Sequence, residues 1–182
     1  MIKDNVLDEK VTVPRLVGKA ALITGGGSGI GRATAILMAK HGAKVCIIDL
    51  HQDEVDQVKK QIESDGGEAL ALVADVSVPE QMEEAIAQTV RRFGRLDIVF
   101  ANAGINGVLT SIEAMEPFDW QQVMDINLKG TFLTVKYAIP HLKANGGSIL
   151  ITASVNGNRV FSNIGFSAYS TTKAGQVAFM KM

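Results

Sequence analysis

The sequence predicts a doubly wound α/β fold, in which a parallel sheet is covered by helices on both faces. Five short apolar runs alternate with longer segments that show helical periodicity. The runs are almost continuously apolar, which is typical of strands that are buried on both faces. Regular alternation of such strands with helices favours a parallel sheet. The strands are expected at residues 20–23, 45–48, 69–74, 96–101 and 148–152.

Each expected strand is followed by a segment with helical spacing of apolar residues, bounded by glycine, proline or small polar residues. Pro79 lies near the start of the third helix, where a missing N–H has no cost. Gly94 ends that helix, and glycines at 146 and 147 end the fourth. The helices are expected at residues 32–41, 53–64, 79–93 and 117–143, with a last one from about residue 166 to the end of the chain.

Composition excludes several classes of protein. The 182 residues are 47% apolar, enough for a sizeable core, and the net charge of −1 argues against nucleic acid or an acidic membrane as the main partner. Cys46 is the single cysteine, so an internal disulfide is excluded and a cytoplasmic location is favoured. It falls in an expected buried strand. Three scattered histidines give no metal-ligand pattern. No secretory signal or membrane span is predicted.

A glycine-rich turn, from Thr24 to Gly31, joins the first strand to the first helix. Such a turn points backbone N–H groups and the positive end of the helix dipole at one place, where an anion can bind. Glycine also lets a pyrophosphate approach the backbone closely. The turn departs from the strict G-x-G-x-x-G spacing, and a glycine cluster alone is more often a plain loop. In this context we expect a dinucleotide at Gly25, Ser28, Gly29, Ile30 and Gly31.

Asp49 ends the second apolar run, near the offset of about 20 residues expected for a carboxylate that binds ribose. Such a carboxylate would accept hydrogen bonds from both ribose hydroxyls and repel a 2′-phosphate. Because Leu50 follows, with no Arg or Lys directly after it, NAD is favoured over NADP. The alternative is that Asp49 only caps the next helix or forms a turn.

Small or polar residues also follow the later strands. Ligands of parallel sheets bind beyond the carboxyl ends of the strands, so these residues would share one edge. Any of them alone could be ordinary turn chemistry, but five strand ends of this kind favour a binding site. The residues concerned are Asp75 and Val76, then Asn102, Ala103 and Gly104, and finally Ser154.

Tyr169 and Lys173 are four residues apart, so they share one face of the last expected helix. A Tyr-x-x-x-Lys pair is common by chance and is usually a surface pairing. Next to a dinucleotide site, however, an ammonium about 4 Å from a phenolate would stabilise it by roughly 4 kcal/mol at an effective dielectric constant of about 20. Tyr169 could then exchange a proton near neutral pH.

Taken together, these motifs resemble the short-chain dehydrogenase/reductase family, whose fold is of the Rossmann type. Its T-G-x-x-x-G-x-G pattern matches residues 24–31, and its N-N-A-G pattern appears at residues 101–104 with Ala101 in place of the first Asn. Its acid after the second strand matches Asp49, and its adenine-contacting Asp matches Asp75. The resemblance implies an oxidoreductase that transfers a hydride between a nicotinamide cofactor and a small secondary alcohol or ketone.

The family's catalytic tetrad maps onto Asn127, Ser154, Tyr169 and Lys173. The resemblance implies that Ser154 binds the substrate oxygen and that Tyr169 moves the proton. Lys173 would assist Tyr169 and bind the nicotinamide ribose, while the backbone carbonyl of Asn127 would anchor a water that relays protons. Asn127 could instead be an ordinary helix residue. Ser154 could be a turn residue that competes with Thr152 and Ser162 for its role.

Members of this family are longer than this chain, so we expect a C-terminally truncated domain whose last strands are missing. Residues 1–18 would be a surface arm, and residues 19–182 the incomplete dinucleotide-binding domain. A homotetramer or dimer is implied for the full-length protein. The alternative function is a dinucleotide-binding or interaction module without catalysis.

Overall fold

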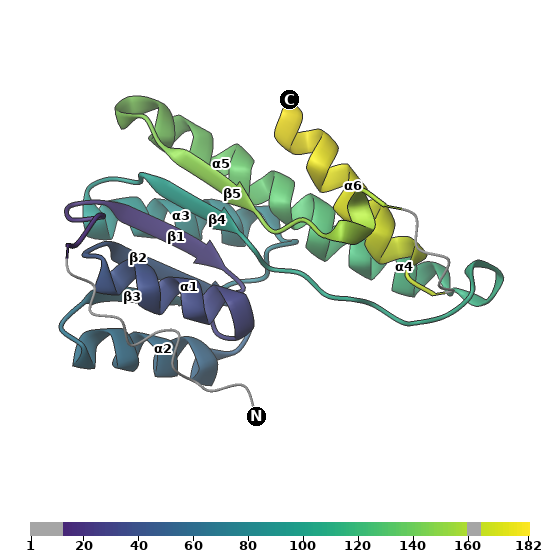
Figure 1. Ribbon diagram of the computed structural model, residues 1–182, viewed down its shortest axis with the longest axis horizontal. Coiled ribbons are helices and arrows are strands. Elements are labelled where there is room, and N and C mark those ends of the chain that lie inside the picture. The colour runs from purple at the N-terminus through teal and green to yellow at the C-terminus, as the bar shows by residue number, and fades with distance from the viewer. Residues whose placement is uncertain (1–12, 160–164) are drawn as a thin grey trace.

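The computed structural model of the chain describes residues 13–159 and 165–182. Residues 1–12 of the expected arm and Ser162 therefore lie outside the described residues. Within them, five parallel strands form one sheet in the order β3-β2-β1-β4-β5 (Figure 1). The strands are β1 (Ala20–Thr24), β2 (Lys44–Asp49), β3 (Glu68–Val73), β4 (Ile98–Ala101) and β5 (Ser148–Ile151).

Helices alternate with the strands, as the sequence predicts. The α-helices are α1 (Gly29–Lys40), α2 (Gln52–Ser64), α3 (Pro79–Phe93), α4 (Pro117–Val123), α5 (Gly130–Asn145) and α6 (Ser167–Lys181). Short elements complete the list: the 3₁₀ turns η1 (Ile112–Ala114) and η3 (Val155–Gly157), and the π-helical segment η2 (Met124–Lys129). Among the described residues, no helix is both long enough and apolar enough to cross a membrane.

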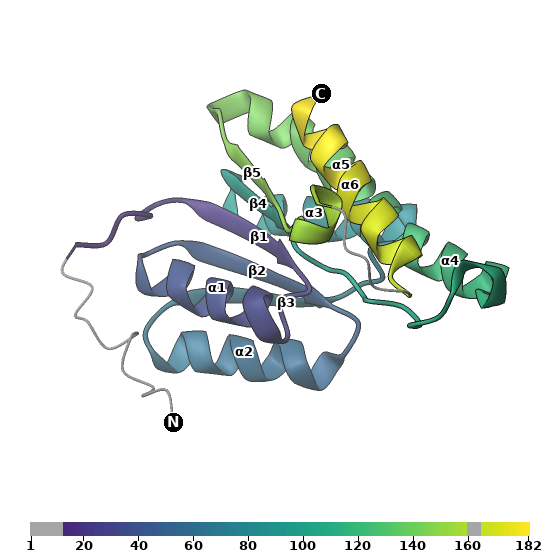
Figure 2. The same cartoon turned by 45° about the vertical axis from the view of Figure 1, so that its right-hand side comes forward.

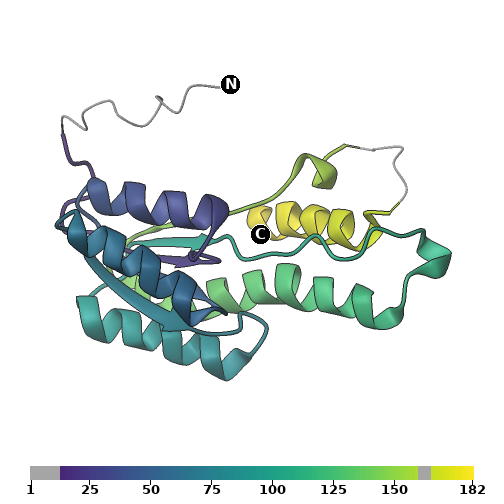
Figure 3. The same ribbon diagram turned by 90° about the horizontal axis from the view of Figure 1, so that it is seen from below.

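Two apolar cores hold the helices to opposite faces of the sheet, so the predicted doubly wound α/β class is confirmed. Successive residues of β2 point alternately to the two faces: Cys46 and Ile48 pack with α3 and α5, whereas Val45 and Ile47 pack with α1 and α2. Figure 3 shows the two helical layers above and below the sheet. Cys46 is fully buried, as expected of a small core residue, and burial raises the pKa of its thiol to about 12.

Two elements differ from the sequence expectation in ways that affect the site. The first helix begins at Gly29 rather than at Arg32, so the last glycines of the turn belong to its first turn. The single helix expected at residues 117–143 is divided into α4, η2 and α5. A π-helical turn holds one extra residue and is often found at functional sites. Both differences lie at the carboxyl ends of the strands.

The strand β5 lies at the edge of the described sheet and is the least covered strand. Its residues Ile149 and Leu150 are 38% and 42% exposed. Figure 2 shows α6 lying toward the carboxyl end of β5, with the start of the strand left open.

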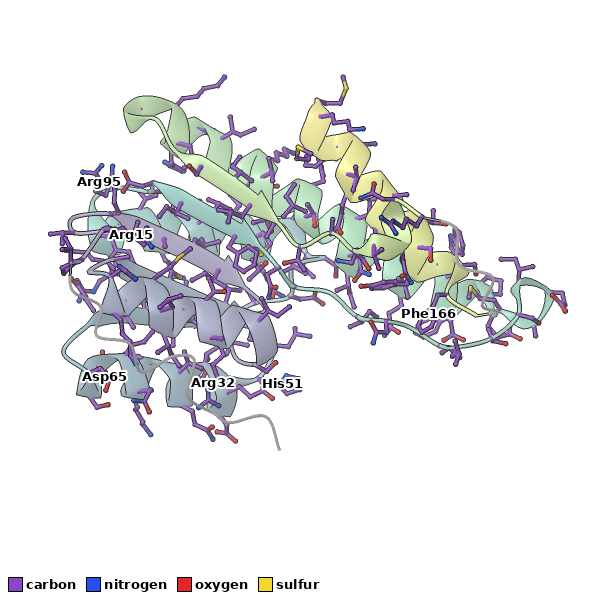
Figure 4. All side chains as sticks on the ribbon, viewed as in Figure 1. Arg15, Arg32, His51, Asp65, Arg95 and Phe166 are labelled. Atoms are coloured by element: carbon purple, nitrogen blue, oxygen red, sulfur yellow. The ribbon has the colours of Figure 1, made fainter. Side chains whose placement is uncertain are left out.

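At the amino ends of the strands, opposite their carboxyl ends, Asp97 joins the starts of β1 and β4. Its side chain is 3% exposed, accepts hydrogen bonds from the Ala20 amide at 2.9 Å and the Arg95 Nε at 2.7 Å, and pairs with Lys19 at 3.2 Å. Burial alone would raise the pKa of Asp97, but the hydrogen bonds from Arg95, Ala20 and Lys19 outweigh it and hold this pKa at about 2. Figure 4 shows Arg95 at this edge, far from His51.

Asp97→Asn is expected to lower the free energy of unfolding at pH 7 by about 2 kcal/mol, because it removes charge-assisted hydrogen bonds. The pKa of Asp97 is lower folded than unfolded, so its contribution is present above about pH 4 and is lost as the pH falls toward about 2. Urea denaturation at several pH values should therefore show that the free energy of unfolding falls less steeply with decreasing pH in the variant than in the unaltered chain. The exposed Asp65 provides the control, and equal effects of Asp65→Asn and Asp97→Asn would contradict the assignment.

Candidate functional site

A cavity of about 500 Å³ lies at the carboxyl ends of the strands, where the sequence predicts the site. It brings together segments from across the chain. Residues expected at the site that line it are Gly25, Ser28, Gly29, Ile30, Asp49, Leu50, Asp75, Val76, Asn102, Ala103, Gly104, Tyr169 and Lys173. Gly31, Asn127 and Ser154 are not among its lining residues.

The glycine turn places the start of α1 at one wall of the cavity. Ser28 is the N-cap residue with extended backbone, and its side chain makes no capping hydrogen bond to a described residue. The first N–H groups of α1 therefore remain available to an anion. An ideal Cβ placed on Gly29 would meet no described atom within 4 Å, so the space in front of this helix end is open.

Asn102 joins the ends of three strands behind the cavity. Its amide nitrogen donates to the carbonyls of Thr24 at 3.1 Å and Gly25 at 3.2 Å, while its Oδ1 accepts from the Thr152 hydroxyl at 2.9 Å. The Thr24 hydroxyl in turn accepts from the backbone amides of Asn102 and Ala103. This network fixes the rim of β1, β4 and β5, so Asn102 organises the cavity as well as lining it.

The two acids expected to face the adenosine are held by backbone amides. Asp49 accepts from the Gly27 amide at 2.9 Å and from the Leu50 amide at 2.8 Å, one bond for each carboxylate oxygen. Asp75 accepts from both the amide and the hydroxyl of Ser77 through its Oδ1. Each carboxylate is thus oriented by the protein and keeps further acceptor sites for a ligand.

Tyr169 and Lys173 reach the far end of the same cavity from α6. The Lys173 Nζ lies 5.5 Å from the centre of the Tyr169 ring and donates to the Thr152 carbonyl. Lys173 is 3% exposed, and burial lowers its pKa. The ring of Phe166, labelled in Figure 4, meets the ring of Tyr169 edge to face at 6.2 Å and restricts its position.

Asn127 lies behind Lys173 in the π-helical segment and is fully buried. Its side chain bonds both the amide and the carbonyl of Ile105, at 2.8 and 2.9 Å, and donates to the Thr172 hydroxyl at 3.1 Å. Its backbone carbonyl accepts from the Thr131 hydroxyl at 2.7 Å and from the Gln176 amide at 2.8 Å. Asn127 therefore ties α6 to the segment after β4, and its water-relay role stays a prediction.

Gln176 is a residue of this network that the sequence reasoning missed. Its amide nitrogen donates to the Asn127 carbonyl and to the Thr131 hydroxyl, both at 2.8 Å, and its side chain is 1% exposed. Its Oε1 has no hydrogen-bond partner among the described residues. The only available signal was its spacing of three from Lys173, which places both residues on neighbouring helical positions.

Ser154 occupies the N-cap of the short turn η3. Its hydroxyl accepts from the Asn156 amide at 3.2 Å, which is the turn role weighed as the alternative. Thr152, the competing residue, lines the cavity instead. The sequence reasoning also assigned no role to His51, Ala74, Ile105, Asn106 and Ile126, which line the cavity as well. Ala74 was expected at the end of the third strand, and the other four lie in loops or in the π-helical segment, where apolar periodicity gives no signal.

Comparisons with known proteins agree with this geometry. The family model described as short chain dehydrogenase matches residues 19–182. Over 174 residues the chain is 38% identical to a cyclohexanol dehydrogenase from Acinetobacter sp. (strain SE19). The aligned region covers 95% of this chain and 68% of that protein.

Two solved structures are also similar. A 3-ketoacyl-ACP reductase from Sinorhizobium meliloti 1021 is 48% identical, with a TM-score of 0.86 over 88% of this chain and 63% of its own. A carveol dehydrogenase from Mycobacterium avium in complex with NAD is 30% identical, with a TM-score of 0.87 over 92% of this chain and 65% of its own. The chain thus spans about two thirds of the length of these relatives. The family model and the relatives together show that the chain belongs to the short-chain dehydrogenase/reductase family.

Proposed function

We propose that the chain carries the cofactor site and the proton-transfer groups of an NAD-dependent dehydrogenase that acts on a small secondary alcohol or ketone. The observation that carries this proposal is that one and the same cavity is lined both by the glycine turn and by Tyr169 and Lys173. A binding module would need only the first of these features. Family membership likewise favours the enzyme over a module without catalysis.

The residues present suit a nicotinamide dinucleotide. The free N–H groups at the start of α1 and the open space before Gly29 suit a pyrophosphate. Asp49 offers oriented carboxylate oxygens to a ribose, and Asp75 with Val76 lies where an adenine would be held. We assign NAD rather than NADP because Asp49 would face the adenosine ribose and Leu50 supplies no positive charge.

The bound cofactor would supply the hydride chemistry. Tyr169 would donate its hydroxyl proton to a ketone oxygen, or accept the proton of an alcohol. Lys173 would stabilise the phenolate and bind the nicotinamide ribose, and Asn127 would keep Lys173 and α6 in place. Ser154 would hold the substrate oxygen. Its present bond to the Asn156 amide leaves its own proton free to donate.

The test starts with NADH titrated into the purified chain and followed by cofactor fluorescence. Saturable binding is expected. A panel of secondary alcohols that includes cyclohexanol and carveol, chosen from the names of the relatives, is then offered with NAD, and NADH production is followed by absorbance. Binding together with oxidation of one alcohol supports the enzyme. Binding without turnover of any alcohol or ketone supports the non-catalytic module, and absence of binding contradicts both.

The full-length protein would also test the assembly. We propose a small-molecule alcohol or ketone as its substrate and a homotetramer or dimer as its assembled state. Light scattering of that protein would give the number of subunits. A monomer with full activity would contradict the proposed assembly without affecting the proposed chemistry.

A further inference from the structure

A second carboxylate, that of Glu54, lies beside Asp49, which lines the end of the cavity proposed for the adenosine ribose; Glu54 itself is not a lining residue. An ideal Cβ placed on Gly27 would be 2.8 Å from the Glu54 Cβ, 3.0 Å from the Glu54 Oε2 and 3.1 Å from the Asp49 Oδ2. The two carboxylates therefore lie against the same glycine. One ligand atom each from Asp49, His51 and Glu54 all lie within 4.8 Å of one another.

The charge of Glu54 is not neutralised by a neighbour. The described residues give Glu54 neither an ion pair nor a hydrogen bond from a cationic side chain, although other acids of the chain have such partners. The Nδ1 atom of His51 lies 3.9 Å from the Asp49 Oδ1, but the His51 side chain is 69% exposed. The negative charge of Glu54 consequently adds to that of Asp49 at this point.

Glu54 also lies in the first turn of a helix, where the charge of an anion is favoured. It is the third residue of α2, whose first helical hydrogen bond runs from the Val55 amide to the His51 carbonyl. The N–H groups before Val55 and the helix dipole attract an anion. Figure 4 shows His51 at this end of α2 and Asp65 at the other end, so the helix start faces the cavity side of the sheet.

We propose that Glu54 is a second specificity-determining residue, which together with Asp49 excludes the 2′-phosphate of NADP(H) from the cavity. The inference rests on the proposed function, since it assumes a dinucleotide in this cavity. Asp49 selects NAD by binding the ribose hydroxyls. Glu54 acts through its charge, because a 2′-phosphate carries about −1.5 to −2 at pH 7 and would lie within a Debye length of about 10 Å at 0.1 M salt.

The test compares dissociation constants of NADH and NADPH, both followed by fluorescence, in the purified chain and in Glu54→Gln. Glutamine keeps the shape of the side chain and removes its charge. We expect NADPH to bind about tenfold tighter in Glu54→Gln, with NADH changed less than about twofold. The gain should largely disappear at 1 M salt, where the Debye length is about 3 Å. EDTA in the buffer removes any divalent cation held by Asp49, His51 and Glu54.

Asp65→Asn is the matched control, because it removes the same charge from an exposed position at the other end of α2, about 20 Å from the start of the helix. The ratio of the two dissociation constants should change less than about twofold in this variant. An equal shift in Asp65→Asn and Glu54→Gln would overturn the assignment, as would a change in NADH affinity equal to the change in NADPH affinity. Binding of neither cofactor by the unaltered chain would contradict the proposed function itself, and the inference with it.

Discussion

Tyr169→Phe is expected to lower the turnover of the alcohol substrate by about a thousandfold and to leave NADH binding nearly unchanged. The variant loses the phenolic hydroxyl, which is the group proposed to move the proton, and general acid–base catalysis contributes factors of this size. The aromatic ring remains, so its edge-to-face contact with Phe166 and its packing beside Lys173 are kept. Steady-state kinetics with NAD, combined with NADH fluorescence titration, measures both effects.

The control for Tyr169 is Tyr137, a phenol on α5 that packs at the margin of the apolar core and is not among the cavity-lining residues. Tyr137→Phe should keep normal turnover. Unchanged turnover in Tyr169→Phe would contradict the assignment of the proton-transfer group. Loss of turnover together with loss of NADH binding would instead assign Tyr169 a structural or cofactor-binding role.

The fold could be predicted from sequence because its central strands, β1 and β2, are buried on both faces. The runs around Ile23 and Ile47 are apolar throughout. A strand is therefore predicted there even when its boundary is placed one residue too early or too late. The π-helical segment at Asn127 could not be predicted, since one extra residue in a turn leaves no periodic signal. The helix α1 also begins three residues before the predicted start at Arg32. Gly29 and Gly31 have poor helix propensity, but the surrounding structure holds them in the first turn.

The candidate site was predicted in outline for a related reason. The carboxyl ends of parallel strands share one edge, so Asp49, Asp75 and Asn102 could be placed together without any side-chain contact. Residues that contact the predicted site residues through tertiary packing were missed. Glu54 approaches Asp49 only because Gly27 lies between them, and Gln176 meets the Asn127 carbonyl across two helices. Ser154, assigned by family resemblance, makes a local turn contact, and its catalytic role stays a prediction.

Gly31→Ala is expected to weaken NADH binding by about a hundredfold and to lower the thermal midpoint of unfolding. A Cβ on Gly31 would lie 2.0 Å from the Gly25 carbonyl oxygen and 2.8 Å from the Asn102 Nδ2. The first turn of α1 and the glycine turn would have to move apart by roughly 1 Å, a displacement that can change function by this factor. The hydrogen bond from Asn102 to the Gly25 carbonyl would be disrupted by the same movement.

Gly66→Ala separates this local effect from a general loss of stability. Gly66 follows α2, has a positive φ of 82° and has no described atom within 4 Å of an ideal Cβ. Alanine there costs about 1–2 kcal/mol of backbone strain, far from the cavity. We therefore expect Gly66→Ala to unfold at a lower temperature and still bind NADH normally. Normal NADH affinity in Gly31→Ala would show that the close approach of α1 to Gly25 is not required, because a turn able to absorb a methyl group does not depend on glycine for its shape.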